Sequence, residues 1–286
     1  MITKRFIFDH TVQLTKKFFE YLPARSKTCV LAEFAEQIIP VQTQQTPVGE
    51  IQFYSFGVLP DWRAETLLTK EPETLEWIDN FEKGSVFWDV GANVGCYSLY
   101  AGKKDGITVW AFEPSSLNYY ILNQNIFLNH LDKQISALCI AFSDQGGVGY
   151  LNMSDMKPGS AFNSFGEAEN SMQGANLTLS NVQFHQCMLG FSMDEFCAKY
   201  SVSTPNYLKI DVDGLEPQIL DGAQQILSSP AFKSLLVEFE CDSPQYPSII
   251  QKLESFGLKL VKQGKAPVIN SKVINIRNHI FSKVSQ

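Results

Sequence analysis

Four ionisable side chains follow one another closely in the segment Leu-Lys-Ile-Asp-Val-Asp-Gly-Leu-Glu, which begins at Leu208. Its first half predicts a strand that Asp211 closes, with Lys209 and Asp213 on the same face if the strand geometry continues. A carboxylate in this position can accept a proton from a reacting group, so Asp211 and Glu216 are candidate catalytic bases. The alternative is structural, with a turn and helix cap from Asp213 to Glu216 and with Lys209 paired to a neighbouring acid.

Two further acids, Glu238 and Glu240, lie at the end of the next predicted strand and reach the same edge of the sheet. Carboxylates on neighbouring strands could hold a hard cation such as magnesium, which takes oxygen ligands. One of them could instead act alone as a general base, with Glu240 as the third candidate after Asp211 and Glu216. We favour this second interpretation and expect no metal. The 6 cysteines form no Cys-x-x-Cys pair and no close group with histidine, which argues against a zinc site.

A glycine-containing turn joins a predicted strand, residues 86–90, to a predicted helix. Gly91 permits a tight turn, Gly95 permits close packing or close approach of a ligand, and the backbone N–H groups of the turn face whatever binds there. The spacing is similar to the dinucleotide fingerprint Gly-x-Gly-x-x-Gly, but Asn93 replaces the second glycine. A pyrophosphate would approach this turn less easily, so a ligand part without phosphate, such as an amino acid moiety, is the better match.

Glu113 ends the next predicted strand, residues 108–112. A carboxylate at the carboxyl end of the second strand of a Rossmann-like unit is placed to accept both hydroxyls of a ribose. The alternative is an exposed glutamate that caps the following helix. We favour ribose binding, because the strand, the glycine turn, the helix, the second strand and the acid occur in the expected order.

The rest of the sequence predicts the sheet that must bring these residues together. From Ser85 onward, short apolar runs rich in β-formers alternate with helical segments, which is typical of a parallel sheet with crossover helices. The expected strands are 86–90, 108–112, 135–141, 206–212 and 235–240. The expected helices are 94–103, 116–129, 192–200, 217–227 and 248–256.

The N-terminal part of the chain follows a different pattern. Residues 11–21 and 27–39 have helical spacing, residues 42–46 look like a connector, and residues 51–56 predict a strand. We therefore expect an N-terminal, mainly helical extension over residues 1–70. Residues 153–183, rich in Ser, Asn, Gly and Met, interrupt the later pattern as a variable insertion or lid.

The composition narrows the class of protein. A net charge of −7 and a pI of about 5.2 argue against a nucleic-acid partner, because affinity for a phosphate backbone comes mostly from Lys and Arg. No apolar stretch is long enough to span a bilayer, and the N-terminus lacks the apolar core and cleavage site of a signal peptide. We expect a cytoplasmic protein with a small-molecule or saccharide partner. A homo-oligomer is left open.

The motifs resemble those of the FkbM-type S-adenosylmethionine-dependent methyltransferases over residues 71–262. The segments that carry the resemblance are Asp89-Val-Gly-Ala-Asn-Val-Gly95, Phe112-Glu-Pro114, Ser192-Met-Asp194, Leu208-Lys-Ile-Asp-Val-Asp-Gly-Leu-Glu216 and Leu220-Asp-Gly-Ala223. The resemblance implies a Rossmann-like class I methyltransferase domain over residues 71–286. Its α/β fold would have a mostly parallel sheet with helices on both faces.

The resemblance also implies a cofactor and roles for particular residues. S-adenosylmethionine would bind with Asp89, Gly91, Asn93 and Gly95 around its methionine part, with Glu113 at the ribose, and with Ala141, Phe142 and Asp144 near the adenine. The expected reaction is transfer of the methyl group to a hydroxyl oxygen of a small molecule or a sugar. An NAD-dependent Rossmann oxidoreductase and a cofactor-binding module without catalysis are the alternatives.

Overall fold

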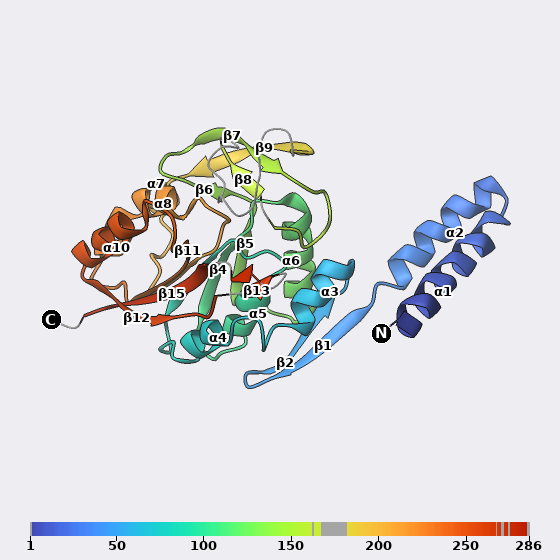
Figure 1. Cartoon of the computed structure of the whole chain (residues 1–286), viewed down its shortest axis with the longest axis horizontal. Coiled ribbons are helices and arrows are strands. Elements are labelled where there is room, and N and C mark those ends of the chain that lie inside the picture. Colours follow the sequence, from blue (N-terminus) through green and yellow to red (C-terminus); the bar gives the residue numbers. More distant parts are fainter. Residues whose placement is uncertain are drawn as a thin grey trace. The chain divides into compact units, whose positions relative to one another are not determined.

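The computed structural model describes residues 2–161, 163–166, 182–266, 268–269, 272–273 and 275–284. Within it the chain divides into two compact units, Met1–Val41 and Gln42–Gln286 (Figure 1). The division therefore falls before the boundary expected at residue 70, and residues 42–70 pack with the larger unit. Residues 162 and 167–181 of the expected insertion lie outside the described residues.

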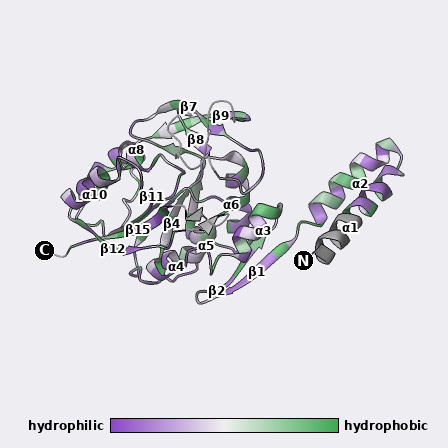
Figure 2. Ribbon diagram, in the orientation of Figure 1, coloured by the Kyte–Doolittle hydropathy of each residue, from purple (hydrophilic) through white to green (hydrophobic). Residues whose placement is uncertain are grey.

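The smaller unit contains two helices, α1 (Ile2–Glu20) and α2 (Ala24–Gln37), which confirms the helices predicted there. The rings of Phe19 and Phe34 join them, with centroids 5.3 Å apart. Apolar and hydrophilic residues are interleaved along α2 (Figure 2), and no residue of α2 is buried. Among the described residues, no helix is both long enough and apolar enough to cross a bilayer.

A mostly parallel sheet forms the centre of the larger unit and confirms the predicted α/β fold (Figure 1). Its strands, in spatial order, are β12 (Leu258–Gln263), β15 (Ile276–Lys283), β11 (Ser234–Glu240), β10 (Tyr207–Ile210), β3 (Val86–Val90), β4 (Thr108–Phe112) and β5 (Ile135–Leu138). The pairs from β11 to β5 are parallel, whereas β15 is antiparallel to both of its neighbours.

Helices cover both faces of this sheet, as predicted. One apolar cluster packs α4 (Pro72–Asp79), α5 (Cys96–Gly102) and α6 (Ser116–Leu128) on one face. A second cluster packs α7 (Met193–Tyr200), α8 (Glu216–Asp221), α9 (Gln224–Ser228) and α10 (Tyr246–Ser255) on the other. Neighbouring strand residues divide between the clusters, Phe87 in the first and Trp88 in the second, because successive side chains of a strand point to opposite faces.

Two predicted elements are wrong in extent. The helix expected over 217–227 is divided into α8 and α9 at Gly222, where an added Cβ would lie 2.3 Å from the backbone oxygen of Ser143. The strand expected over 135–141 ends at Leu138. Its last residue belongs to β6 (Ala141–Phe142), which lies in a separate four-stranded sheet.

This second sheet has the order β6-β9-β7-β8, with β7 (Gly147–Met153), β8 (Asn163–Phe165) and β9 (Phe184–Phe191). It includes the start of the segment predicted as an insertion or lid. Two more short strands, β13 (Val268–Ile269) and β14 (Lys272–Val273), follow β12 in the chain and pair with each other before β15 begins.

The connector predicted over 42–46 is also wrong, since these residues belong to a hairpin. Its strands are β1 (Val41–Thr46) and β2 (Gly49–Tyr54), and α3 (Val58–Glu65) follows them. The side chain of Asn129, after α6, accepts a hydrogen bond from the N–H of Gln52 at 2.9 Å and donates to the Gln52 carbonyl at 2.7 Å. The Asn129 amide thus ties β2 to the C-terminal end of α6.

The contact between Asn129 and β2 leads to a stability prediction. Asn129→Leu leaves both backbone groups of Gln52 without their partner, and unpaired buried groups cost about 1 to 3 kcal/mol. Asn123→Leu is the matched control, because Asn123 lies within α6 and its side chain donates to the carbonyl of Tyr119, one turn earlier in that helix. Urea unfolding followed by circular dichroism should show the larger loss of stability for Asn129→Leu. Equal losses in the two variants would contradict this account of the hairpin.

Candidate active site

The glycine turn after β3 lies in close contact with the ends of both neighbouring strands, β10 and β4. Gly91 follows β3 with φ +82°, and a Cβ there would lie 1.9 Å from the backbone oxygen of Asp211, which follows β10. The N–H groups of Gly91 and Ala92 donate to the carbonyl of Phe112, at 2.9 and 3.0 Å, on the other neighbouring strand. Glycine is therefore required by both the backbone conformation and the available space. Gly95, also at positive φ, packs against Leu122 of α6.

Glu113 is buried at the end of β4, beside this turn. Its carboxylate accepts hydrogen bonds from the N–H of Asn93 at 2.8 Å and from the N–H of Ser115 at 2.9 Å. Burial raises the pKa of Glu113 to about 7, and these hydrogen bonds offset part of the rise. The alternative of an exposed glutamate that caps the helix is wrong, because Ser115 is the N-cap of α6.

A pocket opens along the carboxyl edge of the parallel strands. Five of the predicted cofactor-binding residues and one predicted catalytic residue line it together: Gly91, Asn93, Glu113, Ala141 and Phe142, with Asp211. Two of its sides differ in polarity, with carboxylates at the end of β10 and apolar side chains around β6 and β7. The structure therefore brings most of the predicted site residues around one pocket.

A loop and α6 form another wall of this pocket. The side chain of Asn118 donates to the carbonyl of Ser160 at 3.0 Å and accepts from the N–H of Gly159 at 2.8 Å. Arg63 of α3 donates through Nε to the Gly159 carbonyl at 2.8 Å, and the Asn93 amide reaches Ser160 at 3.2 Å. The loop before β8 is thus fixed to three separate elements.

Lys209 provides a buried positive charge beneath the pocket. It is 1% exposed, and its Nζ lies 2.8 Å from Oδ2 of Asp211 and 3.9 Å from Oδ1 of Asp89. It also lies 5.2 Å from the centre of the Tyr97 ring. Burial lowers the pKa of Lys209, but Asp211 and Asp89 outweigh burial and raise it, so the ammonium stays charged.

The two acids beside Lys209 differ in electrostatic environment. Burial raises the pKa of Asp89, which accepts a hydrogen bond from Ser98 at 2.6 Å and lies inside the protein below the turn. For Asp211 the burial effect is opposed by Lys209 and Lys70, and the net result is a lowered pKa. Asp211, unlike Asp89, is therefore an ionised carboxylate in the lining of the pocket.

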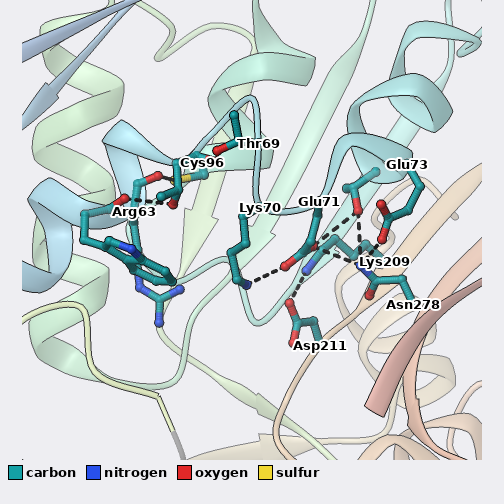
Figure 3. A network of polar contacts seen from close by, with 12 residues as sticks. Arg63, Thr69, Lys70, Glu71, Glu73, Cys96, Lys209, Asp211 and Asn278 are labelled. Atoms are coloured by element: carbon teal, nitrogen blue, oxygen red, sulfur yellow. Dashed lines mark hydrogen bonds and ion pairs between the residues drawn. The ribbon is translucent and has the colours of Figure 1, made fainter. Parts of the chain in front are cut away.

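Lys70 and Glu71 join this network from the segment before α4 (Figure 3). The ammonium of Lys70 donates to Glu71, which is 7% exposed and also accepts from Asn278 of β15 at 3.1 Å. The attraction of Glu71 and Asp211 outweighs burial and raises the pKa of Lys70. This pair could not be recognised from the sequence, because a glutamate before Pro72 is explained equally well as the start of a helix.

Other predicted site residues lie elsewhere. Glu216 is buried, and its carboxylate accepts from the N–H groups of Val212 and Gly214 at 3.2 Å, so it holds the loop after β10. Burial raises the pKa of Glu216 to about 8. Asp144 is exposed and accepts from Ser143 at 3.0 Å.

Glu240 is half-buried at the end of β11. Glu216, Asp144 and Glu240 are not among the described residues that line the pocket. In the same described ranges, no group of three or more His, Cys, Asp or Glu side chains is placed to hold a metal ion.

Comparisons with known proteins give consistent results. The model of the methyltransferase FkbM domain matches residues 89–260. Hexuronic acid methyltransferase AglP of Haloferax volcanii is 26% identical over 171 residues, which cover 60% of this chain and 63% of AglP. The 31-O-demethyl-FK506 methyltransferase FkbM of Streptomyces tacrolimicus is 24% identical over 199 residues, covering 63% of this chain and 75% of the relative. The chain thus spans less than two thirds of AglP.

Among solved structures, the methyltransferase FkbM from Methylobacillus flagellatus aligns with a TM-score of 0.44 at 14% identity. The alignment covers 77% of this chain and 52% of the other.

The turn at Gly91 leads to a prediction with an internal control. Gly84→Ala places a Cβ at a similar positive φ, +85°, with nothing within 4 Å, so it measures the backbone strain alone, about 1 to 3 kcal/mol. Gly91→Ala adds the clash with the Asp211 carbonyl. Chemical unfolding should show a clearly larger loss of stability for Gly91→Ala. If the two variants lose the same stability, the close approach of β3 and β10 at this turn is not a constraint.

Proposed function

Because the chain belongs to the FkbM methyltransferase family, we propose that it transfers the methyl group of S-adenosylmethionine to a hydroxyl oxygen of a small molecule or a sugar. The names of the two relatives support this acceptor class, since one is a hexuronic acid methyltransferase and the other acts on 31-O-demethyl-FK506. Membership of this family also argues against the alternative of an NAD-dependent oxidoreductase.

The residues around the pocket fit S-adenosylmethionine, which supplies an electrophilic methyl group on a positively charged sulfur. The Oδ1 atom of Asn93 is buried and makes no hydrogen bond within the described part of the chain. It can accept a hydrogen bond from the amino group of the methionine part, beside Gly91. Glu113 has further lone pairs for the ribose hydroxyls, because each carboxylate oxygen accepts more than one hydrogen bond. In this proposal Asp89 and Gly95 support the turn from below.

The observation that carries the proposal is the ionised carboxylate of Asp211 in the same pocket as the turn and Glu113. A neutral alcohol attacks poorly, so a group must orient the hydroxyl and accept its proton. Asp211 can do both, and Lys209 holds it in place at 2.8 Å. Glu216 is engaged by backbone N–H groups, and Glu240 lies away from the described pocket wall. We therefore assign the proton acceptor to Asp211, with correct positioning of the acceptor as the other main source of rate.

Glu113 leads to a pH-dependent prediction for cofactor binding. If the ionised carboxylate holds the ribose, affinity for S-adenosylhomocysteine rises with pH as Glu113 loses its proton and levels off above its pKa of about 7. Below that pKa the affinity should fall by up to about tenfold per pH unit.

Calorimetric titrations from about pH 6 to about pH 8 test this, with Glu113→Gln as the control that cannot ionise. The variant should bind more weakly, with a flat pH profile over the same range. An identical slope in the variant and the wild type would remove Glu113 from the ribose site.

Asp211→Asn separates catalysis from cofactor binding. The variant should keep the affinity for S-adenosylhomocysteine within a few fold, while turnover falls by roughly 10² to 10⁴, the usual contribution of a positioned proton acceptor. Turnover is measured as labelled methyl transfer from S-adenosylmethionine to a panel of uronic acids and polyhydroxylated small molecules. Mass spectrometry then identifies the methylated atom.

The control is Asp221→Asn, at an exposed acid of α8 that pairs with Lys252. Normal turnover in Asp211→Asn would show that this acid is structural. Sensitivity of the wild type to chelators, with recovery on added magnesium, would instead indicate a metal-held acceptor. A wild type that binds cofactor and methylates no acceptor class would support a module without catalysis.

A further inference from the structure

The order of the strands sets an order along the pocket. In spatial order, the sheet has β10, β3, β4 and β5 side by side. At the carboxyl edge, β10 ends near Asp211, β3 near Gly91, β4 near Glu113 and β5 near Ile140, and all four residues line the pocket. An extended ligand along this edge therefore meets charge at one end and apolar surface at the other. The apolar end is closed by the second sheet, with Phe142 of β6 and Leu151 of β7. A flat heteroaromatic ring belongs at this end, and a charged sulfonium at the other.

One polar side chain lies at the apolar end. Asn163 of β8 lines the pocket together with Phe165, two residues further along the same strand. Side chains two apart in a strand share a face, so Asn163 and Phe165 both point into the pocket. Phe165 is in register with Leu151, and Asn163 with Met153, across the β7–β8 pair.

The side-chain oxygen of Asn163 has no hydrogen-bond partner among the residues that the structure describes. This Oδ1 atom is also buried. A buried polar atom without a partner costs about 1 to 3 kcal/mol, so a ligand that supplies the missing donor gains this free energy on binding. The ring that the apolar end fits must therefore carry a hydrogen-bond donor at its edge.

We propose that Asn163 recognises the adenine of the cofactor by pairing its side-chain amide with the 6-amino group and an adjacent ring nitrogen. An asparagine amide presents one acceptor and a donor side by side, which matches this edge of adenine. The inference rests on the proposed function. It moves base recognition from Asp144, which is exposed and bonded to Ser143, to the segment predicted as an insertion or lid.

The test is a cycle of two ligands and two proteins. The ligands are S-adenosylhomocysteine and its purine-ribosyl analogue without the 6-amino group, and the proteins are the wild type and Asn163→Leu. Calorimetry should show that the wild type binds the analogue about 10- to 100-fold more weakly. Asn163→Leu should bind both ligands with similar affinity, close to that of the wild type for the analogue.

Ser164→Ala is the matched control, because Ser164 is the next residue of β8 and its side chain points to the other face. This variant should keep the wild-type preference for the amino group. Asn163→Ala, with folding checked by thermal unfolding, repeats the test if leucine disturbs the strand. The 7-deaza analogue of S-adenosylhomocysteine then shows which ring nitrogen is used.

The possible outcomes distinguish the proposed role of Asn163 from the proposed function. Equal binding of the two ligands by the wild type, or a preference for the amino group that persists in both Asn163 variants, would overturn the role of Asn163 and leave the proposed function intact. Failure of the wild type to bind S-adenosylhomocysteine at all would overturn the proposed function itself.

Discussion

The buried ammonium of Lys209 is the constraint on which the carboxyl edge of the sheet, with its pocket, depends. An isolated charge inside a protein costs several kcal/mol, so it persists only where opposite charges and hydrogen bonds compensate it. Lys209 is opposite Asp89 in the register of β10 and β3, and Asp211 is the next residue on its own face. The pairing of Lys209 with Asp89 and Asp211 therefore favours this register of β10 and β3. It also holds the ionised carboxylate of Asp211 at the pocket.

This arrangement links segments that are far apart in the chain. Glu71 precedes the region that matches the family model, yet it lies in the same network and bonds Asn278 of the antiparallel strand β15. Lys70 adds a second positive charge that lowers the pKa of Asp211. The positive charges of Lys70 and Lys209 thus keep Asp211 ionised, so the group proposed to orient the acceptor hydroxyl carries a negative charge.

Local features of the structure were predictable, and features that depend on distant pairing were not. The strand, turn and helix around Gly91 were predicted because glycine and apolar residues specify that geometry within a few positions. The strand β15 was missed, since the buried polar residues Asn278 and His279 interrupt its apolar pattern. Their hydrogen-bond partners come from other elements, because the Asn278 amide donates to Glu71 and the His279 ring bonds the hydroxyl of Tyr246. Asn163 was missed for a similar reason, because its position follows from the pairing of β8 with β7.

Glu216 and Glu240 were proposed from their place at strand ends, which does not reveal which way a side chain points.

The most direct test of the account is a crystal structure of the protein with S-adenosylhomocysteine. We expect the ligand to lie along the carboxyl edge of the parallel strands, with its sulfur at the Asp211 end, its ribose hydroxyls on Glu113 and its adenine against Phe142. In that structure Lys209 should still bridge Asp89 and Asp211. A ligand in the opposite orientation, or one bound away from Asp211 with the Lys209 network unchanged, would contradict the claim that this buried charge organises the active site.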